Sequence, residues 1–458
     1  AKVTLNGKTG GIDGGAGGDN IAVRADTGAE VIINGGVYTV GADANGLGNS
    51  TVYVTDNGKV TINGGTFSSK AAYNGKYYVL NVQNSAKGTF EVKGGTFKDF
   101  DPLSGDDNLG GNFAPEGYGA NRDENGNFTI VAGVVAQVKN ASGKSVKAYA
   151  TLEEALNAAP RKAIVMLLAD TRENVTITQM YITLDLNGHT INGGTVNGKP
   201  AVTVTARVTI KDSSAAQTGT IMREDTAENS GVSSYYVIDV QGDGWLTFEG
   251  GNVINHSGVV GVRGASLVRV GDDSVAEYPG LNIKGGTFTQ DNFIAIKVDR
   301  GDLFLNGGTL NSANSYAIED WHRATVKGGT VNGAVAAWAY SGGLNSTLEI
   351  SGGTINGDVT SVNYGNATDK KATVSVTGGT INGKLDTRSY DPATGDLTSI
   401  NDAAKATIGV SGGTFSTDPT KYVVEDSAIT KNEDGTFGVA KAYLATVGDT
   451  SYYTMEEA

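Results

Sequence analysis

The sequence predicts an all-β protein of the right-handed parallel β-helix class, a β-solenoid in which each turn of chain adds one strand to each of several sheets. Three observations indicate this fold. A Gly-Gly phrase recurs along the chain, the segments between the phrases alternate apolar and polar residues, and the 458 residues include 67 glycines but only 7 prolines. Because there is no strict Gly-X-Y period and 39% of the residues are hydrophobic, neither collagen nor a disordered chain fits.

The spacing of the Gly-Gly phrase indicates stacked repeats, since self-similarity at a period of roughly 20–50 residues is typical of solenoids. The first glycine of the phrase stands at positions 35, 64, 94, 193, 250, 285, 307, 328, 352, 378 and 412. Between the phrases, "TLEI" (347–350) and "TVSV" (373–376) alternate as strands with one buried face do.

Each part of the phrase has a structural role. The glycine pair accepts positive φ and close approach, so the chain can bend sharply between sheets. The next two residues, Thr and a β-branched or aromatic residue, restart a strand, and Asn-Gly makes the following bend. Asn332, Asn356 and Asn382 recur at the same place in successive turns and are expected to form a hydrogen-bonded ladder. The threonines also recur; an outward threonine array could bind ice, but their irregular spacing favours a ladder within the turn.

A larger repeat divides the chain into cassettes. "YATLEEA" at 149–155 returns as "YYTMEEA" at 452–458. The first copy contains a capping box at Thr151 and Glu154, which predicts a short helix near 152–159 that ends at Pro160.

Strands follow the helix at 162–170 and 182–193, and a hairpin over 422–439 is expected to close the cassette. The predicted organisation is the C-terminal coils of a preceding cassette over 1–140, a complete cassette over 141–441, and the start of a following cassette over 442–458.

These segments resemble the pectate-lyase-like β-helix cassettes of large surface proteins from Gram-positive, often gut-dwelling, bacteria. The resemblance is carried by the Gly-Gly-Thr coils, "AYATLEEALNAA" (148–159), "ITLDLNGHTI" (182–191) and "GGTFSTDPTKYVVEDSAITKNEDGTFGV" (412–439). It implies a secreted location, extracellular or at the cell wall, and a non-catalytic structural or adhesive role as a rod or surface-fibre segment. The alternative is a carbohydrate-active enzyme, either a polysaccharide lyase or a glycoside hydrolase, on the same scaffold.

The charge and composition limit the classes of molecule that the chain is expected to bind. The chain has 35 Lys and Arg against 49 Asp and Glu, a net charge of −14, and an acidic surface repels nucleic acid. The longest strongly apolar run, 163–169, is too short to cross a bilayer. The expected partners are neighbouring cassettes or copies of the chain end to end, because open parallel edges would otherwise aggregate, and host or microbial glycans.

The candidate ligand site lies where the repeat changes to "IEDWHRAT" (318–325). Since successive coils stack about 4.8 Å apart, its aromatic residue and those of the next coils could line one ridge that stacks on sugars, flanked by hydrogen-bonding charges. The alternative is a solvated loop with ordinary aromatic packing. The residues of the predicted glycan site are Glu319, Asp320, Trp321, His322, Arg323, Trp338, Tyr340 and Tyr364.

No catalytic residue is assigned. Catalysis on a glycan would need two convergent carboxylates, and Glu319 and Asp320 should point apart as strand neighbours. An acid from an adjacent coil, such as Glu349 or Asp299, would have to complete the pair.

No metal or cofactor is predicted. The three histidines, His189, His256 and His322, do not have metal-ligand spacing and are interpreted as structural. The acidic turns at 242–245 and 272–278 are rich in oxygen ligands, which leaves Ca²⁺ as an alternative. The absence of cysteine excludes disulfides and thiolate metal sites.

Overall fold

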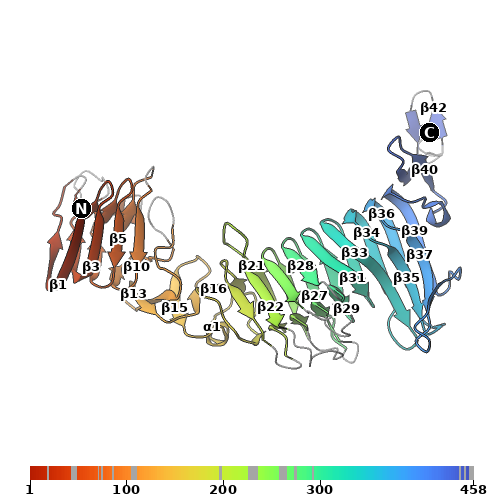
Figure 1. The fold of residues 1–458 in the computed structure, drawn as a ribbon, viewed down its shortest axis with the longest axis horizontal. Coiled ribbons are helices and arrows are strands. Elements are labelled where there is room, and N and C mark those ends of the chain that lie inside the picture. The colour runs from red at the N-terminus through yellow and green to blue at the C-terminus, as the bar shows by residue number, and fades with distance from the viewer. Residues whose placement is uncertain are drawn as a thin grey trace. The chain divides into compact units, whose positions relative to one another are not determined.

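The computed structural model divides the chain into two compact units of short strands (Figure 1). Unit 1 comprises Ala1–Thr171 and Ile182–Asp185, and unit 2 comprises Arg172–Tyr181 and Leu186–Ala458. The described residues are 1–17, 20–42, 49–70, 72–73, 76–84, 87–104, 111–194, 199–224, 236–256, 266–272, 276–290, 293–442, 445–447 and 450–452. The prediction of an all-β chain is confirmed, and the many parallel pairings are compatible with a β-solenoid.

Unit 1 begins with stacked parallel strands. Two rows belong to one sheet, and a third row forms a separate three-stranded sheet. The first sheet contains β1 (Lys2–Asp13), β3 (Glu30–Val40), β5 (Lys59–Ile62), β6 (Thr66–Ser69), β10 (Thr89–Val92) and β11 (Thr96–Lys98); the separate row contains β2 (Ile21–Ala25), β4 (Ser50–Val54) and β9 (Leu80–Val82); and β7 (Ala72–Tyr73) pairs with β8 (Lys76–Tyr77).

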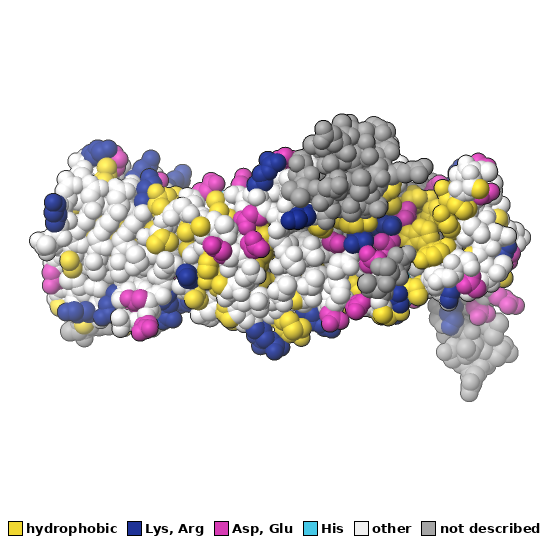
Figure 2. All heavy atoms as spheres, turned by 90° about the horizontal axis from the view of Figure 1, so that it is seen from below, with side chains coloured by type: hydrophobic (Ala, Val, Ile, Leu, Met, Phe, Trp, Pro, Cys, Tyr) yellow, Lys and Arg dark blue, Asp and Glu magenta, His cyan; other side chains and the backbone are white. Residues whose placement is uncertain are grey.

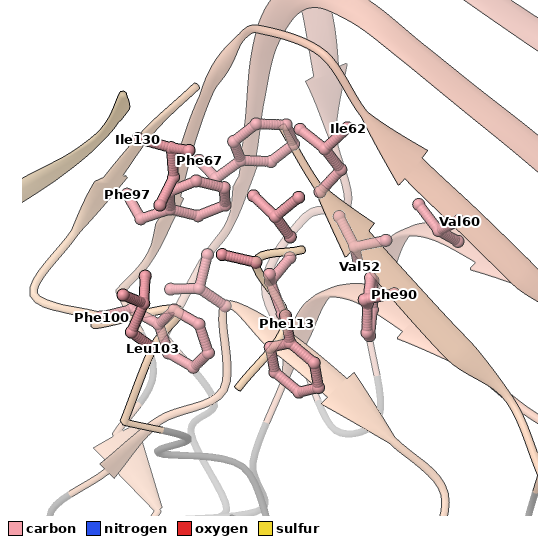
Figure 3. Packing of buried hydrophobic residues seen from close by; sticks show 14 of the residues in the cluster. Val52, Val60, Ile62, Phe67, Phe90, Phe97, Phe100, Leu103, Phe113 and Ile130 are labelled. Atoms are coloured by element: carbon pink, nitrogen blue, oxygen red, sulfur yellow. The ribbon is translucent and has the colours of Figure 1, made fainter. Parts of the chain in front are cut away.

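An aromatic stack in the core of unit 1 is built from the residue that follows each Gly-Gly-Thr or Gly-Gly-Val phrase. Tyr38, Phe67 and Phe97 pair in register across β3, β6 and β11. Their rings stack at 5.1 Å and 4.9 Å between centroids, and Phe67 and Phe97 are fully buried (Figure 3). Burying one such side chain stabilises the fold by about 1.5–3 kcal/mol.

The second part of unit 1 is antiparallel except for its last two strands, which pair in parallel. Its strands are β12 (Tyr118–Arg122), β13 (Asn127–Ala132), β14 (Ala136–Lys139) and β15 (Ser145–Tyr149), followed by α1 (Leu152–Ala158), β16 (Ile164–Leu167) and β18 (Thr183–Asp185). The helix lies within the range expected from the capping box. Thr151 Oγ1 accepts a hydrogen bond from the Glu154 N–H at 3.2 Å, and Leu152 and Leu156 are buried.

Unit 2 contains three rows of parallel strands. The first row is β21 (Arg207–Lys211), β24 (Trp245–Phe248), β27 (Gly280–Ile283), β30 (Asp302–Leu305), β32 (Arg323–Val326), β34 (Ser346–Ile355), β36 (Ala372–Ile381) and β39 (Ala406–Phe415). The second row is β19 (Thr190–Asn192), β22 (Thr220–Glu224), β25 (Asn252–His256), β28 (Thr287–Gln290), the starts of β31 (Thr309–Asp320) and β33 (Thr330–Tyr340), and the ends of β34, β36 and β39.

The third row, which carries the candidate site, starts with β17 (Val175–Ile177), β20 (Val202–Val204), β23 (Ile238–Val240), β26 (Val268–Val270) and β29 (Ile296–Val298). It continues through the ends of β31 and β33 to β35 (Val359–Tyr364) and β37 (Leu385–Tyr390). β38 (Leu397–Ser399) pairs antiparallel with β37.

The hairpin expected over 422–439 corresponds to β40 (Ser427–Lys431) and β41 (Phe437–Lys441), and β41 also pairs with β39. A 3-10 turn, η2 (Thr420–Tyr422), precedes it, and β42 (Ala445–Val447) and β43 (Thr450–Tyr452) form a further hairpin. Most of the second "YYTMEEA" copy lies outside the described residues.

The glycine pair bends the chain as expected. In the pair 328–329, Gly329 has φ +82°, and a Cβ built on it would lie 2.7 Å from the carbonyl oxygen of Gly308. Any side chain would therefore be both strained and in contact with the backbone of the preceding coil. The threonines that follow the pairs lie in register from Thr287 to Thr414.

The asparagine ladder is confirmed. Asn332 donates to Asn311 at 2.8 Å, Asn356 donates to Asn332 at 2.7 Å, and Asn382 donates to Asn356 at 2.7 Å. A side-chain amide has both donor and acceptor atoms, so each member can bond to the coil before it and the coil after it.

Candidate functional site

The candidate site lies on the outward face of the third row in unit 2. In β29, Ile296 and Val298 are buried in the interior, whereas Lys297 between them is partly exposed. Lys297 pairs in register with Glu319 of β31, which shares this outward face. On the face seen in Figure 2, a hydrophobic patch (yellow) lies over the C-terminal half of unit 2, beside basic and acidic side chains.

Three successive strands each supply a tyrosine to this face. Tyr340, Tyr364 and Tyr390 end the segments "AWAY", "SVNY" and "TRSY" and pair in register across β33, β35 and β37. The Tyr364 and Tyr390 rings stack, with 5.2 Å between centroids and 23° between planes. Because these parallel strands pair residue by residue, the tyrosine of each coil lies next to the tyrosine of the coil before it.

The tyrosines belong to a larger aromatic cluster. Trp338 is buried at its floor with Ala336 and Val362, and partly exposed rings surround it. The Trp338 ring lies 5.3 Å from Trp321 and 5.7 Å from Tyr390 between centroids. Each such pair contributes about 0.5–1.5 kcal/mol beyond the area it buries. The members of this aromatic cluster are Tyr316, Trp321, Trp338, Tyr340, Tyr364 and Tyr390.

An open pocket of about 290 Å³, the aromatic pocket, lies at one end of this cluster. It is lined by Lys297, Asp299, Trp321, Tyr340 and Tyr364. The Trp321 ring meets Tyr340 and Tyr364 at 74° and 69°, so the three rings form a concave wall instead of a flat stack. Charged groups come from Lys297 of β29 and from Asp299 just after it, whose Nζ and Oδ1 atoms lie 2.9 Å apart.

Glu319 ties the charged residues to the aromatic ones. Its Oε1 accepts a hydrogen bond from Trp321 Nε1 at 2.8 Å, which orients the indole at the pocket wall. Burial raises the pKa of Glu319, and the indole hydrogen bond and the Lys297 charge only partly offset this. For Lys297, burial lowers the pKa, but the charge and hydrogen bond of Asp299 outweigh burial and raise it overall. The pocket therefore holds a charged ammonium at neutral pH.

Three of the predicted site residues lie elsewhere. Asp320 points into the interior, where its carboxylate accepts hydrogen bonds from Ser346 Oγ at 2.7 Å and from the His322 N–H at 3.1 Å. Burial raises the pKa of Asp320 to about 7. His322 Nδ1 contacts the backbone of Gly301, and Arg323 pairs with Asp302 at 2.6 Å.

The separation has a simple cause. Side chains alternate along a strand, so the neighbours Glu319 and Asp320 point to opposite faces. The chain then turns after β31, and Arg323 begins the next strand of the first row. The structure brings Glu319, Trp321, Trp338, Tyr340 and Tyr364 together, and it places Asp320, His322 and Arg323 away from the aromatic pocket.

Sequence reasoning did not assign four residues of this face: Lys297, Asp299, Tyr316 and Tyr390. Asp299 was considered only as a second acid. Two signals could have found them. "IKVD" at 296–299 occupies the register of "IEDW" at 318–321, and "TRSY" repeats the terminal tyrosine of the two coils before it.

Among the described residues, no group of three His, Cys, Asp or Glu side chains converges as a metal site. At the acidic turn proposed for Ca²⁺, Asp272 pairs with Arg269 at 3.0 Å, and residues 273–275 lie outside the described part of the chain. No described helix is long and apolar enough to cross a membrane.

No protein-family model, curated protein or solved structure matches the chain. Because a fold by itself does not determine a function, the function has to be argued from the site.

Proposed function

We propose that the chain is a right-handed parallel β-helix segment of an extracellular structural or adhesive rod, and that the aromatic pocket binds carbohydrate. One observation carries the binding proposal. The Trp321 ring, steeply inclined to the Tyr340 and Tyr364 rings, lines a pocket of about 290 Å³ together with them and the ion pair Lys297–Asp299.

This combination suits a sugar ring. The C–H faces of a sugar pack on aromatic rings, whereas its hydroxyl groups need donors and acceptors at the edges. Trp321, Tyr340 and Tyr364 supply the aromatic surface, and Lys297 and Asp299 supply hydrogen-bonding atoms of both kinds. A ligand pocket is typically apolar with a few fixed polar groups, as here.

The rod role is supported by the rows of parallel strands. Each coil covers the apolar edge of its neighbour, so stability accumulates along the stack and the outward face is free to carry a site. The resemblance to pectate-lyase-like cassettes of Gram-positive surface proteins favours secretion and display on the cell wall.

We further propose that cassettes or copies dock end to end. Analytical ultracentrifugation checks this: a concentration-dependent rise in sedimentation coefficient is expected, and a monomer at all concentrations would contradict self-docking.

A second candidate function, cleavage of the bound glycan, is favoured by one observation. Asp299 lines the pocket beside Trp321, and Glu319 is hydrogen-bonded to the same indole. Lys297 pairs in register with Glu319, so Asp299 lies two residues further along the neighbouring strand direction on the same outward side, and a glycosidase needs two such carboxyl groups close together. Glu319, with its raised pKa, would then be the acid, and the ion-paired Asp299 the base or nucleophile.

A glycan array tests binding. The chain is screened beside Trp321→Ala and beside Trp245→Ala, a matched tryptophan of the first row that stacks on Phe304 outside the pocket. We expect the wild type and Trp245→Ala to bind the same glycans, and Trp321→Ala to lose them. Equal binding by all three would contradict the proposed pocket, as would binding by none.

Incubating the chain with the glycans that it binds on the array distinguishes binding from cleavage. A binding protein leaves them intact, whereas an enzyme releases new reducing ends, or unsaturated ends in the case of a lyase. Release that is lost in Glu319→Gln would favour the enzyme, and no release over a day would favour the non-catalytic role.

A further inference from the structure

A second hollow lies on the same outward face. Its volume is about 630 Å³, and its wall includes Tyr316, Asn356, Asp358, Thr360 and Arg388. Gly333 and Ala334 of β33 also line it, and their small size leaves the room that larger side chains fill elsewhere on this face. We call it the polar hollow.

The polar hollow and the aromatic pocket lie at opposite ends of the aromatic cluster. Thr360 precedes Tyr364 on β35 by four residues, which spans about 13 Å at about 3.3 Å per residue. Tyr316 borders the hollow and Trp321 borders the pocket, and both rings contact Trp338, at 5.8 Å and 5.3 Å between centroids. An aromatic surface therefore joins the two cavities.

The polar hollow offers hydrogen-bonding capacity that the described residues do not use. Arg388 donates through Nε to Asp386 at 3.0 Å, but its two terminal nitrogens bond to no described residue, and 29% of its side chain is exposed. Thr360 Oγ1 is buried in the wall with no partner among the described residues. Because Thr360 lines the hollow, a ligand group there would supply the partner that this hydroxyl lacks.

We infer that the two cavities form one site for an extended oligosaccharide. One sugar occupies the aromatic pocket, the chain crosses the rims of Trp321 and Tyr316, and a later sugar is hydrogen-bonded by Arg388 and Thr360. This inference rests on the proposed carbohydrate binding and adds that the ligand is an internal stretch of a polysaccharide, not a single terminal sugar.

The test is a chain-length series measured by isothermal titration calorimetry. The probes are oligomers of β-1,4-linked glucose, xylose and N-acetylglucosamine and of α-1,4-linked glucose, each from monosaccharide to hexasaccharide. For the wild type, we expect the affinity in at least one series to rise with length by tenfold or more. Arg388→Gln should lose about tenfold for the long oligomers, as expected for one hydrogen bond to a charged group, and nothing for the shortest binder.

Two further variants keep the outcomes distinct. Arg207→Gln, an arginine of the first row that lies over Trp245, should bind like the wild type. Trp321→Ala should lose short and long oligomers alike. Affinity that is independent of length, or a length effect that survives in Arg388→Gln, overturns the extended site and leaves the aromatic pocket standing. If no oligomer binds, the extended site and the proposed carbohydrate binding are both overturned.

Discussion

The third row of strands presents different outward side chains in unit 1 and in unit 2. In unit 1 the row β2–β4–β9 follows the Gly-Gly strands as the third row does in unit 2, and its outward register column is Arg24, Tyr53 and Asn81. Arg24 lies over the Tyr53 ring at 5.8 Å, and these residues line a polar cavity in which Tyr53 is the one aromatic residue of the described lining. The corresponding face of unit 2 carries the aromatic cluster. The outward positions vary while the scaffold is retained.

The inward positions differ far less. In unit 1 Phe67 and Phe97 stack in one row at 4.9 Å, and in unit 2 Phe248 of the first row meets Phe288 of the second row edge-on at 4.9 Å; all four are fully buried. Aromatic residues therefore occur in both units, and their meaning depends on the face they occupy. An inward aromatic residue stabilises the stack, whereas an outward one is available to a ligand.

The largest expected effect comes from breaking the inward stack. Phe67→Ala should lower the free energy of unfolding by about 3–5 kcal/mol, because it removes a fully buried ring held between Tyr38 and Phe97. The outward Tyr53→Ala should change it by less than about 1 kcal/mol. Urea denaturation followed by circular dichroism measures both. Equal losses would refute the distinction between inward and outward aromatic residues.

A smaller effect concerns the interior residue beside the site. Burial raises the pKa of Asp320 to about 7, against an ordinary value of 3.8. The folded state thus binds this proton more tightly than the unfolded chain does, so the group's contribution to stability is present below about pH 4 and is lost as the pH rises through 7. Relative to the wild type, Asp320→Asn should gain up to roughly 4 kcal/mol between these limits, at about 1.4 kcal/mol per pH unit.

Urea midpoints for the wild type and Asp320→Asn from pH 4 to pH 8 check this. The comparison of the two proteins cancels the titration of other carboxylates. Asn keeps a partner for Ser346 Oγ, so the variant tests charge more than packing. If the two midpoints run parallel across the range, the carboxyl does not titrate there. Because Asp320 faces inward, glycan binding should be unchanged.

The all-β architecture of repeated parallel strands and the aromatic part of the candidate site could be predicted from the sequence for the same reason. The repeat fixes which residues fall at the same place in successive coils, so Trp321, Trp338, Tyr340 and Tyr364 were expected on one ridge, and the structure places them together. The alternation of a strand predicts that Glu319 and Asp320 point apart, but the repeat does not predict which of the two faces outward. β31 is irregular between Asn311 and Ile318, and such a bulge decides which side chains face out without changing the repeat.

The glycine turn shared by both units should show an intermediate effect. Gly329→Ala combines a φ of +82° with a contact of 2.7 Å to a backbone oxygen, and should cost about 2–3 kcal/mol. Gly342 has φ +81°, but no atom lies within 4 Å of the place where a Cβ would stand, so Gly342→Ala isolates the backbone strain, about 1 kcal/mol. Thermal melting of both variants gives the comparison. Equal shifts would mean that the close stacking of coils at the turn costs nothing.

The smallest expected effect concerns the asparagine ladders, which occur in both units but at different positions in the repeat: Asn34 directly precedes a glycine pair, whereas Asn332 follows one. Asn34 bonds to Asn6 at 2.7 Å and to Asn63 at 2.8 Å, and Asn332 is likewise bonded on both sides, to Asn311 at 2.8 Å and to Asn356 at 2.7 Å. These amides are exposed, so water replaces most of what each substitution removes. Asn34→Ala and Asn332→Ala should each cost about 1 kcal/mol by urea denaturation and leave glycan binding unchanged. A loss of binding in Asn332→Ala alone would instead assign the ladder of unit 2 to the ligand site, and the division between a constant scaffold and a variable outward face would have to be redrawn along the second row.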